Sequence, residues 1–69
     1  MKKIIILIPV FNDWESLIKL INEINENIKD YKNINFECLV VNDASTINQP
    51  ELIKPNNLKS LQILNMKEN

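Results

Sequence analysis

The chain has 69 residues, a length that allows at most one small domain. Of these residues 45% are hydrophobic, and the formal net charge is −1. It contains neither Gly nor His, so Gly-rich phosphate-binding loops are excluded and the commonest general base and metal ligand is missing. The eight basic residues are scattered among nine acidic ones, without the basic stripe that binding to nucleic acid requires. The single Cys38 excludes an internal disulfide. A chain of this size without disulfides or bound metal ions is only marginally stable, so we expect it to be a piece of a larger unit.

The first predicted element is a buried strand over Ile4 to Val10, a continuous β-branched run that ends before the polar Asn12. Lys2 and Lys3 before this run also resemble the start of a signal peptide. The run lacks a small-residue cleavage site and continues into acidic residues, so we favour the strand. Pairing should weaken at Pro9, which has no N–H.

A helix is predicted from Trp14 to residues 29–31, because apolar residues recur there at steps of three and four. Asn12 with Glu15 resembles a capping box, and Asp13 is the alternative cap. We assign Trp14 to the core rather than to a ligand platform. The apolar positions are Trp14, Leu17, Ile18, Ile21, Ile24, Ile28 and Tyr31.

The second strand is predicted over Phe36 to Val41, whose apolar run is typical of a strand buried on both faces. We assign Cys38 within it to packing rather than to a reactive thiol. A loop follows over Asn42 to Gln49.

After the loop, Pro50 suits the first turn of a short helix that runs to Ile53 and is stopped by Pro55. Residues 56–57 read as a turn. A third strand runs from Leu58 or Ser60 to Leu64, followed by a polar tail over residues 65–69.

This order of elements predicts an α/β fold. The links are long enough for parallel crossovers, which are right-handed in nearly all known cases. We expect a three-stranded parallel sheet of order 3-2-1 with one long and one short helix, the amino-terminal half of a Rossmann-like domain.

In such a sheet the first two strands are neighbours, and their carboxyl ends lie at one edge, where ligands of open α/β sheets bind. Pro9 and Phe11 then form an apolar wall beside the carboxylate of Asp43. A nucleobase needs a stacking surface and an acceptor for its ring N–H, and Asp43 could accept the N3–H of a uracil. The alternative interpretation is that Phe11 belongs to the core and that Asp43 caps a following helical turn.

Two motifs flank the predicted helix and second strand: I-P-V-F-N at residues 8–12 and V-V-N-D-A-S-T at residues 40–46. At this spacing they resemble the amino-terminal part of the family 2 glycosyltransferases, whose patterns are roughly I-P-x-Y-N-E and V-D-D-G-S-T. The resemblance covers essentially the whole chain.

The resemblance implies a GT-A fold that binds a nucleotide-diphosphate sugar, with UDP favoured and GDP as the alternative. Position by position, Pro9 and Phe11 would line the nucleoside pocket. Asp43 would contact the base, and Ser45 would order the loop. Asn12 and Asp13 fall where the family has N-E, near the nucleotide. The sugar would pass by inverting displacement to a lipid, polysaccharide or protein acceptor.

Three residues depart from the family pattern. Phe11 replaces Tyr, which keeps the stacking face and loses the hydroxyl. Asn42 replaces the first acid, which matters less if Asp43 makes the base contact. Ala44 replaces Gly, and since a positive φ costs an Ala on the order of 1 kcal/mol, we expect the loop to keep φ negative here.

The family's D-x-D motif and its later acidic base do not occur in the sequence. Sugar transfer needs a base for the acceptor hydroxyl and a cation for the leaving diphosphate, so Mg or Mn is expected only in the complete domain. We predict no catalytic and no metal-binding residue here, and a chain that is inactive alone. Residues 1–69 would be the amino-terminal part of a single family 2 domain. It would be cytoplasmic, or at the inner face of the membrane through missing regions.

A second hypothesis is a small non-catalytic α/β module that binds a nucleotide or a protein. A nucleotidyltransferase ranks lower, because that class opens with a Gly-rich loop after the first strand, and this sequence has no Gly.

Overall fold

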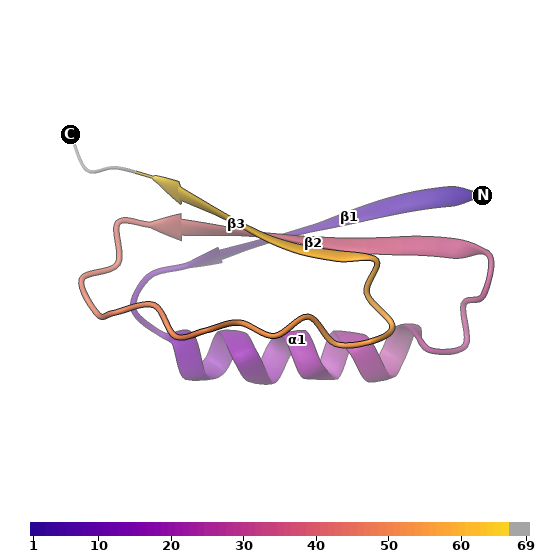
Figure 1. The fold of residues 1–69 in the computed structure, drawn as a ribbon, viewed down its shortest axis with the longest axis horizontal. Helices are drawn as coiled ribbons and strands as arrows, with labels where there is room; N and C mark the ends of the chain where they lie inside the picture. Colours follow the sequence, from indigo (N-terminus) through magenta and orange to yellow (C-terminus); the bar gives the residue numbers. More distant parts are fainter. Residues whose placement is uncertain (67–69) are drawn as a thin grey trace.

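A computed structural model describes residues 1–66 of the chain. It contains a parallel sheet of three strands in the order β1-β2-β3 (Figure 1). The parallel α/β sheet and its strand order are therefore as predicted. The strands are β1 (Lys2–Val10), β2 (Ile34–Asp43) and β3 (Ser60–Met66).

The strands extend beyond the predicted apolar runs because each continues to pair with its neighbour. Lys2 is in register with Ile34, and pairing passes through Pro9 to Val10 instead of weakening. β1 is an edge strand, where a residue without an N–H is tolerated. β3 takes in the first two residues of the predicted polar tail, and the rest of that tail, residues 67–69, lies outside the described part.

The helix α1 (Trp14–Ile28) forms where the apolar periodicity predicts it. Its N-cap is Asp13, whose Oδ1 accepts a hydrogen bond from the Ser16 N–H at 3.2 Å. The alternative cap is therefore correct, and the capping box between Asn12 and Glu15 is wrong. The helix ends at Ile28, whose carbonyl accepts from the Tyr31 N–H at 3.0 Å.

The core lies between α1 and one face of the sheet, and both predicted core residues, Trp14 and Cys38, belong to it. Val40, at the centre of β2, is 0% exposed. The segment between β2 and β3 lies on the same side of the sheet as α1 (Figure 1). The buried residues are Ile8, Val10, Trp14, Leu17, Ile21, Ile28, Cys38, Val40 and Leu58.

The opposite face of the sheet, here called the open face, has no helix over it in the described part of the chain. Successive side chains of a strand point to opposite faces, so the neighbours in sequence of the buried Ile8 and Val40 point to the open face. Two residues of this face, Leu7 and Leu64, are 63% and 52% exposed. The sheet therefore carries apolar side chains on both faces, with only one of them covered.

The short helix predicted from Pro50 to Ile53 does not form, and residues 48–55 are irregular. The residue before Pro55 is disfavoured in the helical region, so only a few residues remain, too few for a turn with internal hydrogen bonds. The segment is tied down by side chains instead. The Lys54 ammonium donates to the Leu58 carbonyl at 2.8 Å. The predicted turn at residues 56–57 is present.

Candidate functional site

The carboxyl ends of the three strands lie at one edge of the sheet. Pro9 of β1 is in register with Val41 of β2, and Val41 with Leu64 of β3. Asp43, the last residue of β2, is in register with Met66. The two motifs of the sequence are thus brought together as predicted, on parallel neighbouring strands.

The connection from β1 to α1 is bonded to the loop that follows β2. The Asn12 N–H donates to Ser45 Oγ at 2.8 Å. The side-chain Oδ1 of Asn12 accepts from the backbone N–H groups of Thr46 at 2.7 Å and Ile47 at 2.9 Å. Its Nδ2 donates to Thr46 Oγ1 at 3.1 Å. Hydrogen bonds of Asn12 and Ser45, two of the predicted site residues, therefore join the β1–α1 connection to the loop after β2.

Trp14 adds a further bond to the same loop, since its indole N–H donates to the Ile47 carbonyl at 3.2 Å. The side chain is otherwise in the core, where it is 5% exposed. Sequence reasoning identified the apolar role of Trp14 and missed this bond, for which helical periodicity gives no signal. The bond ties the loop after β2 to the first turn of α1.

Both connections contain a residue with positive φ, Asn12 at 64° and Ala44 at 57°. The expectation of a negative φ at Ala44 is wrong. The Ser45 N–H donates to Asn42 Oδ1 at 3.1 Å, so this three-residue link closes over Ala44 and offsets its steric cost. At Asn12, a hydrogen bond from the Asp13 N–H to the Phe11 carbonyl at 2.8 Å closes a γ-turn.

Asn42, which stands where the family pattern has an acid, is also paired across the sheet. Its Nδ2 donates to Asn65 Oδ1 at 2.9 Å. The amide is thus held from both of its ends, by Ser45 and by Asn65. A carboxylate at this position would lack the donor for Asn65, so the pair fits the amide that this sequence has.

Three of the predicted site residues, Pro9, Phe11 and Asp13, line one cavity of about 190 Å³ near the start of α1, together with Ser16. Phe11 is 59% exposed, so its assignment to the core is wrong. Asp43 does not line this cavity.

Asp43 is exposed at the tip of β2, and within residues 1–66 its carboxylate makes neither a hydrogen bond nor an ion pair. It caps no helix, because the next regular element is β3. The alternative role of Asp43 as a helix cap is therefore wrong. Asp13, by contrast, already accepts the Ser16 N–H as the cap of α1.

The described residues do not form a metal centre. No group of three or more His, Cys, Asp or Glu side chains within residues 1–66 could hold a metal ion. Cys38 is 1% exposed in mid-strand, and burial raises the pKa of its thiol, which fits packing rather than reactivity. Within the same range, no helix is long and apolar enough to cross a membrane.

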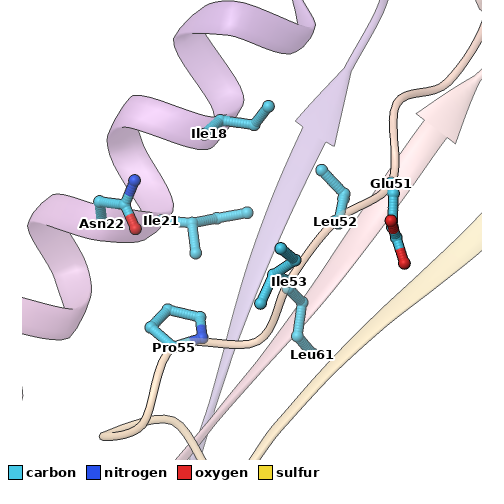
Figure 2. Close-up of a pocket in the computed structure, with 8 residues that line it drawn as sticks. All are labelled: Ile18, Ile21, Asn22, Glu51, Leu52, Ile53, Pro55 and Leu61. Atoms are coloured by element: carbon cyan, nitrogen blue, oxygen red, sulfur yellow. The ribbon is translucent and has the colours of Figure 1, made fainter.

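A larger cavity of about 320 Å³ lies away from the strand tips, between the middle of α1 and the irregular segment before β3 (Figure 2). Apart from Asn22 and Glu51, its walls are aliphatic or Pro side chains. None of the predicted site residues lines it. The cavity occurs where the predicted short helix does not form, and it is lined by Ile18, Ile21, Asn22, Glu51, Leu52, Ile53, Pro55 and Leu61.

No curated protein and no solved structure matches the chain. The family model described as Glycosyl transferase family 2 matches residues 5–69. This match covers both strand-tip motifs, β2, β3 and the part of β1 from residue 5 onward, and the chain belongs to glycosyl transferase family 2.

Proposed function

We propose that this chain carries the nucleoside-binding part of a glycosyltransferase, and that it binds a nucleotide-diphosphate sugar, with uracil as the favoured base. Membership of the family supports the glycosyltransferase class. The single observation that carries the choice of site is the carboxylate of Asp43 at the tip of β2, which has no hydrogen-bond or ion-pair partner among residues 1–66 and lies beside the ends of β1 and β3.

The surroundings of Asp43 supply the second requirement of a base, a surface on which to stack. Pro9, Val41 and Leu64 form a row across the three strands, and residues in register project to the same face. This is the open face, because Val41 follows the buried Val40. Asp43 lies two residues beyond Val41 on the same strand and shares its face. A ring lying on this apolar row can place its N–H against the carboxylate.

The acceptor-only character of a carboxylate favours a base that offers a ring N–H at this point. Uracil has such a group at N3. The exposed Phe11, on the connection that follows Pro9, can supply a further stacking face for the nucleoside.

The sequence contains neither the family's D-x-D motif nor its later acidic base. We therefore propose that residues 1–69 bind the donor without transferring the sugar, as the amino-terminal part of a single domain. The uncovered apolar side chains of β1 away from the strand tips, Ile5 and Leu7, support this proposal, because a complete domain buries such side chains. The base for the acceptor hydroxyl and the Mg or Mn for the diphosphate would come with the rest of that domain.

The test is a titration with uridine diphosphate followed by ligand-observed NMR. Loss of a charge-assisted hydrogen bond to the base should weaken binding by about 1.5–3 kcal/mol, roughly 10- to 150-fold, in Asp43→Ala. Asp30→Ala is the matched control, since Asp30 is an exposed carboxylate beyond the other end of α1. Equal affinity of Asp43→Ala and the wild-type chain would remove Asp43 from the site.

A further inference from the structure

The loop that follows Asp43 is attached to the rest of the molecule by two side chains, Asn12 of the β1–α1 connection and Trp14 of the first turn of α1. We propose that Asn12 and Trp14 form a latch, defined by their hydrogen bonds to residues 45–47, that positions this loop for the nucleoside. Asn12 is then a positioning residue and not a contact to the nucleotide. The inference rests on the proposed function for its ligand, while the latch itself can be tested without one.

The carboxamide of Asn12 is already committed at both ends. Its Oδ1 accepts two successive backbone N–H groups, those of Thr46 and Ile47, at 2.7 and 2.9 Å. Its Nδ2 donates to the Thr46 hydroxyl at 3.1 Å. A side chain that turned toward a nucleotide would break all three of these bonds and leave the two backbone donors to water.

Ile47 is held on both sides. Asn12 accepts its N–H at 2.9 Å, and the Trp14 indole donates to its carbonyl at 3.2 Å. Since Trp14 is 5% exposed and packed in the core, the latch ties an exposed loop to the buried core of the molecule. Trp14 is the only tryptophan of the chain, so its indole N–H reports on the latch without any labelling of other residues.

Bonds from outside the loop matter because its backbone contains one unfavourable conformation. Ala44 is in the left-handed region at a φ of 57°, and no Gly relieves it. Inside the loop, the Asn42 side chain restrains Ser45 by one bond of 3.1 Å. The latch supplies further bonds to residues 45–47, and Asp43 lies two residues before the first of them.

The residue at position 12 must adopt a positive φ and must carry a side-chain oxygen that accepts hydrogen bonds. Its φ of 64° favours Asn, Asp or Gly. Asp would keep an oxygen that accepts from Thr46 and Ile47, whereas Gly would keep the backbone and lose every side-chain bond. Asn12→Asp and Asn12→Gly therefore separate the latch from the backbone strain.

The experiment uses the full chain, with uridine as the probe because it lacks phosphates that a new carboxylate would repel. Amide hydrogen exchange of Thr46 and Ile47, the Trp14 indole N–H signal and the uridine Kd are measured by NMR. The Val40 amide, at the fully buried centre of β2, is the internal reference for global unfolding.

In Asn12→Gly we expect faster exchange at Thr46 and Ile47 relative to Val40, and a displaced indole signal. Uridine binding should weaken about tenfold, because one more loop residue must be ordered on binding. Asn12→Asp should retain the exchange protection and the affinity of the wild-type chain. Unchanged exchange and Kd in Asn12→Gly would overturn the latch, and so would an Asn12→Asp chain that behaves like Asn12→Gly.

The two proposals fail in different ways. If Asp43→Ala weakens uridine binding and Asn12→Gly does not, the site stands and the latch is overturned. If uridine does not bind the wild-type chain, the proposed function fails, and the exchange and indole signals alone decide the latch.

Discussion

Replacing Ala44 by Gly should stabilise the fold. Ala44 is held at a φ of 57° by the hydrogen bond from the Ser45 N–H to Asn42 Oδ1. The left-handed region costs an L-residue roughly 1–2 kcal/mol, which Gly does not incur. Gly gives back about 0.4–1 kcal/mol through the greater entropy of the unfolded chain. At the midpoints of these two ranges, Ala44→Gly is about 0.8 kcal/mol more stable.

A gain of this size corresponds to a rise in Tm of roughly 2–8 °C for a domain of this length. Urea unfolding followed by Trp14 fluorescence measures the free energy directly, with thermal unfolding as the second measurement. Ala44→Val is the control of opposite sign, because a β-branched side chain is the least compatible with positive φ. If φ at this position were negative, Gly would only add entropy to the unfolded chain, and Ala44→Gly would be less stable than the wild-type chain. That result would refute the positive φ.

The remaining predictions concern the stability of the helix layer and core. Asp13→Ala should lose about 1 kcal/mol of unfolding free energy, because the Ser16 N–H loses its cap, while Asp13→Ser should lose less. Asn22→Leu should be more stable than Asn22→Ala in urea unfolding, because both gain helix propensity and only Leu fills the cavity of Figure 2. Burial raises the pKa of Cys38, so its thiol stays protonated in the folded state at a pH where the unfolded chain ionises. The free energy of unfolding should therefore fall as pH rises above about 8.5, and Cys38→Ala should remove that part of the decline.

The regular elements were predictable because they follow from repeated patterns. The apolar run at Cys38 to Val41 requires a central strand, and the three- and four-residue steps after Trp14 require a helix against one face. With one helix and two crossover links, a parallel sheet follows, and it brings Pro9 and Asp43 to one edge. A pattern spread over many residues still predicts its helix or strand when one of those residues departs from it.

The details of the site depend on single side chains, and there the predictions were less successful. Local preference favours Asn12 as a helix cap, but its oxygen accepts from Thr46 and Ile47 across the sheet edge. A negative φ at Ala44 is the lower-energy choice for an isolated loop, and the loop's hydrogen bonds override it. Both differences arise from contacts between residues more than 30 positions apart or from loop closure, which no local pattern encodes.

The missing short helix has a related cause. Pro50 is a favourable first helical residue by itself, and it predicts a short helix that Pro55 stops. The outcome is set by the distance to Pro55 and by the anchoring of the segment at Leu58, which is 1% exposed. Packing of the segment's end therefore decides its conformation.

The most direct test of the account is to map the uridine diphosphate site on the isotopically labelled chain by NMR. The account predicts chemical-shift changes concentrated at the strand tips on the open face, at Val41, Asp43 and Leu64, and their loss in Asp43→Ala. Changes centred on Ile21 and Leu52, which line the aliphatic cavity on the opposite face, or no changes at saturating ligand, would contradict it.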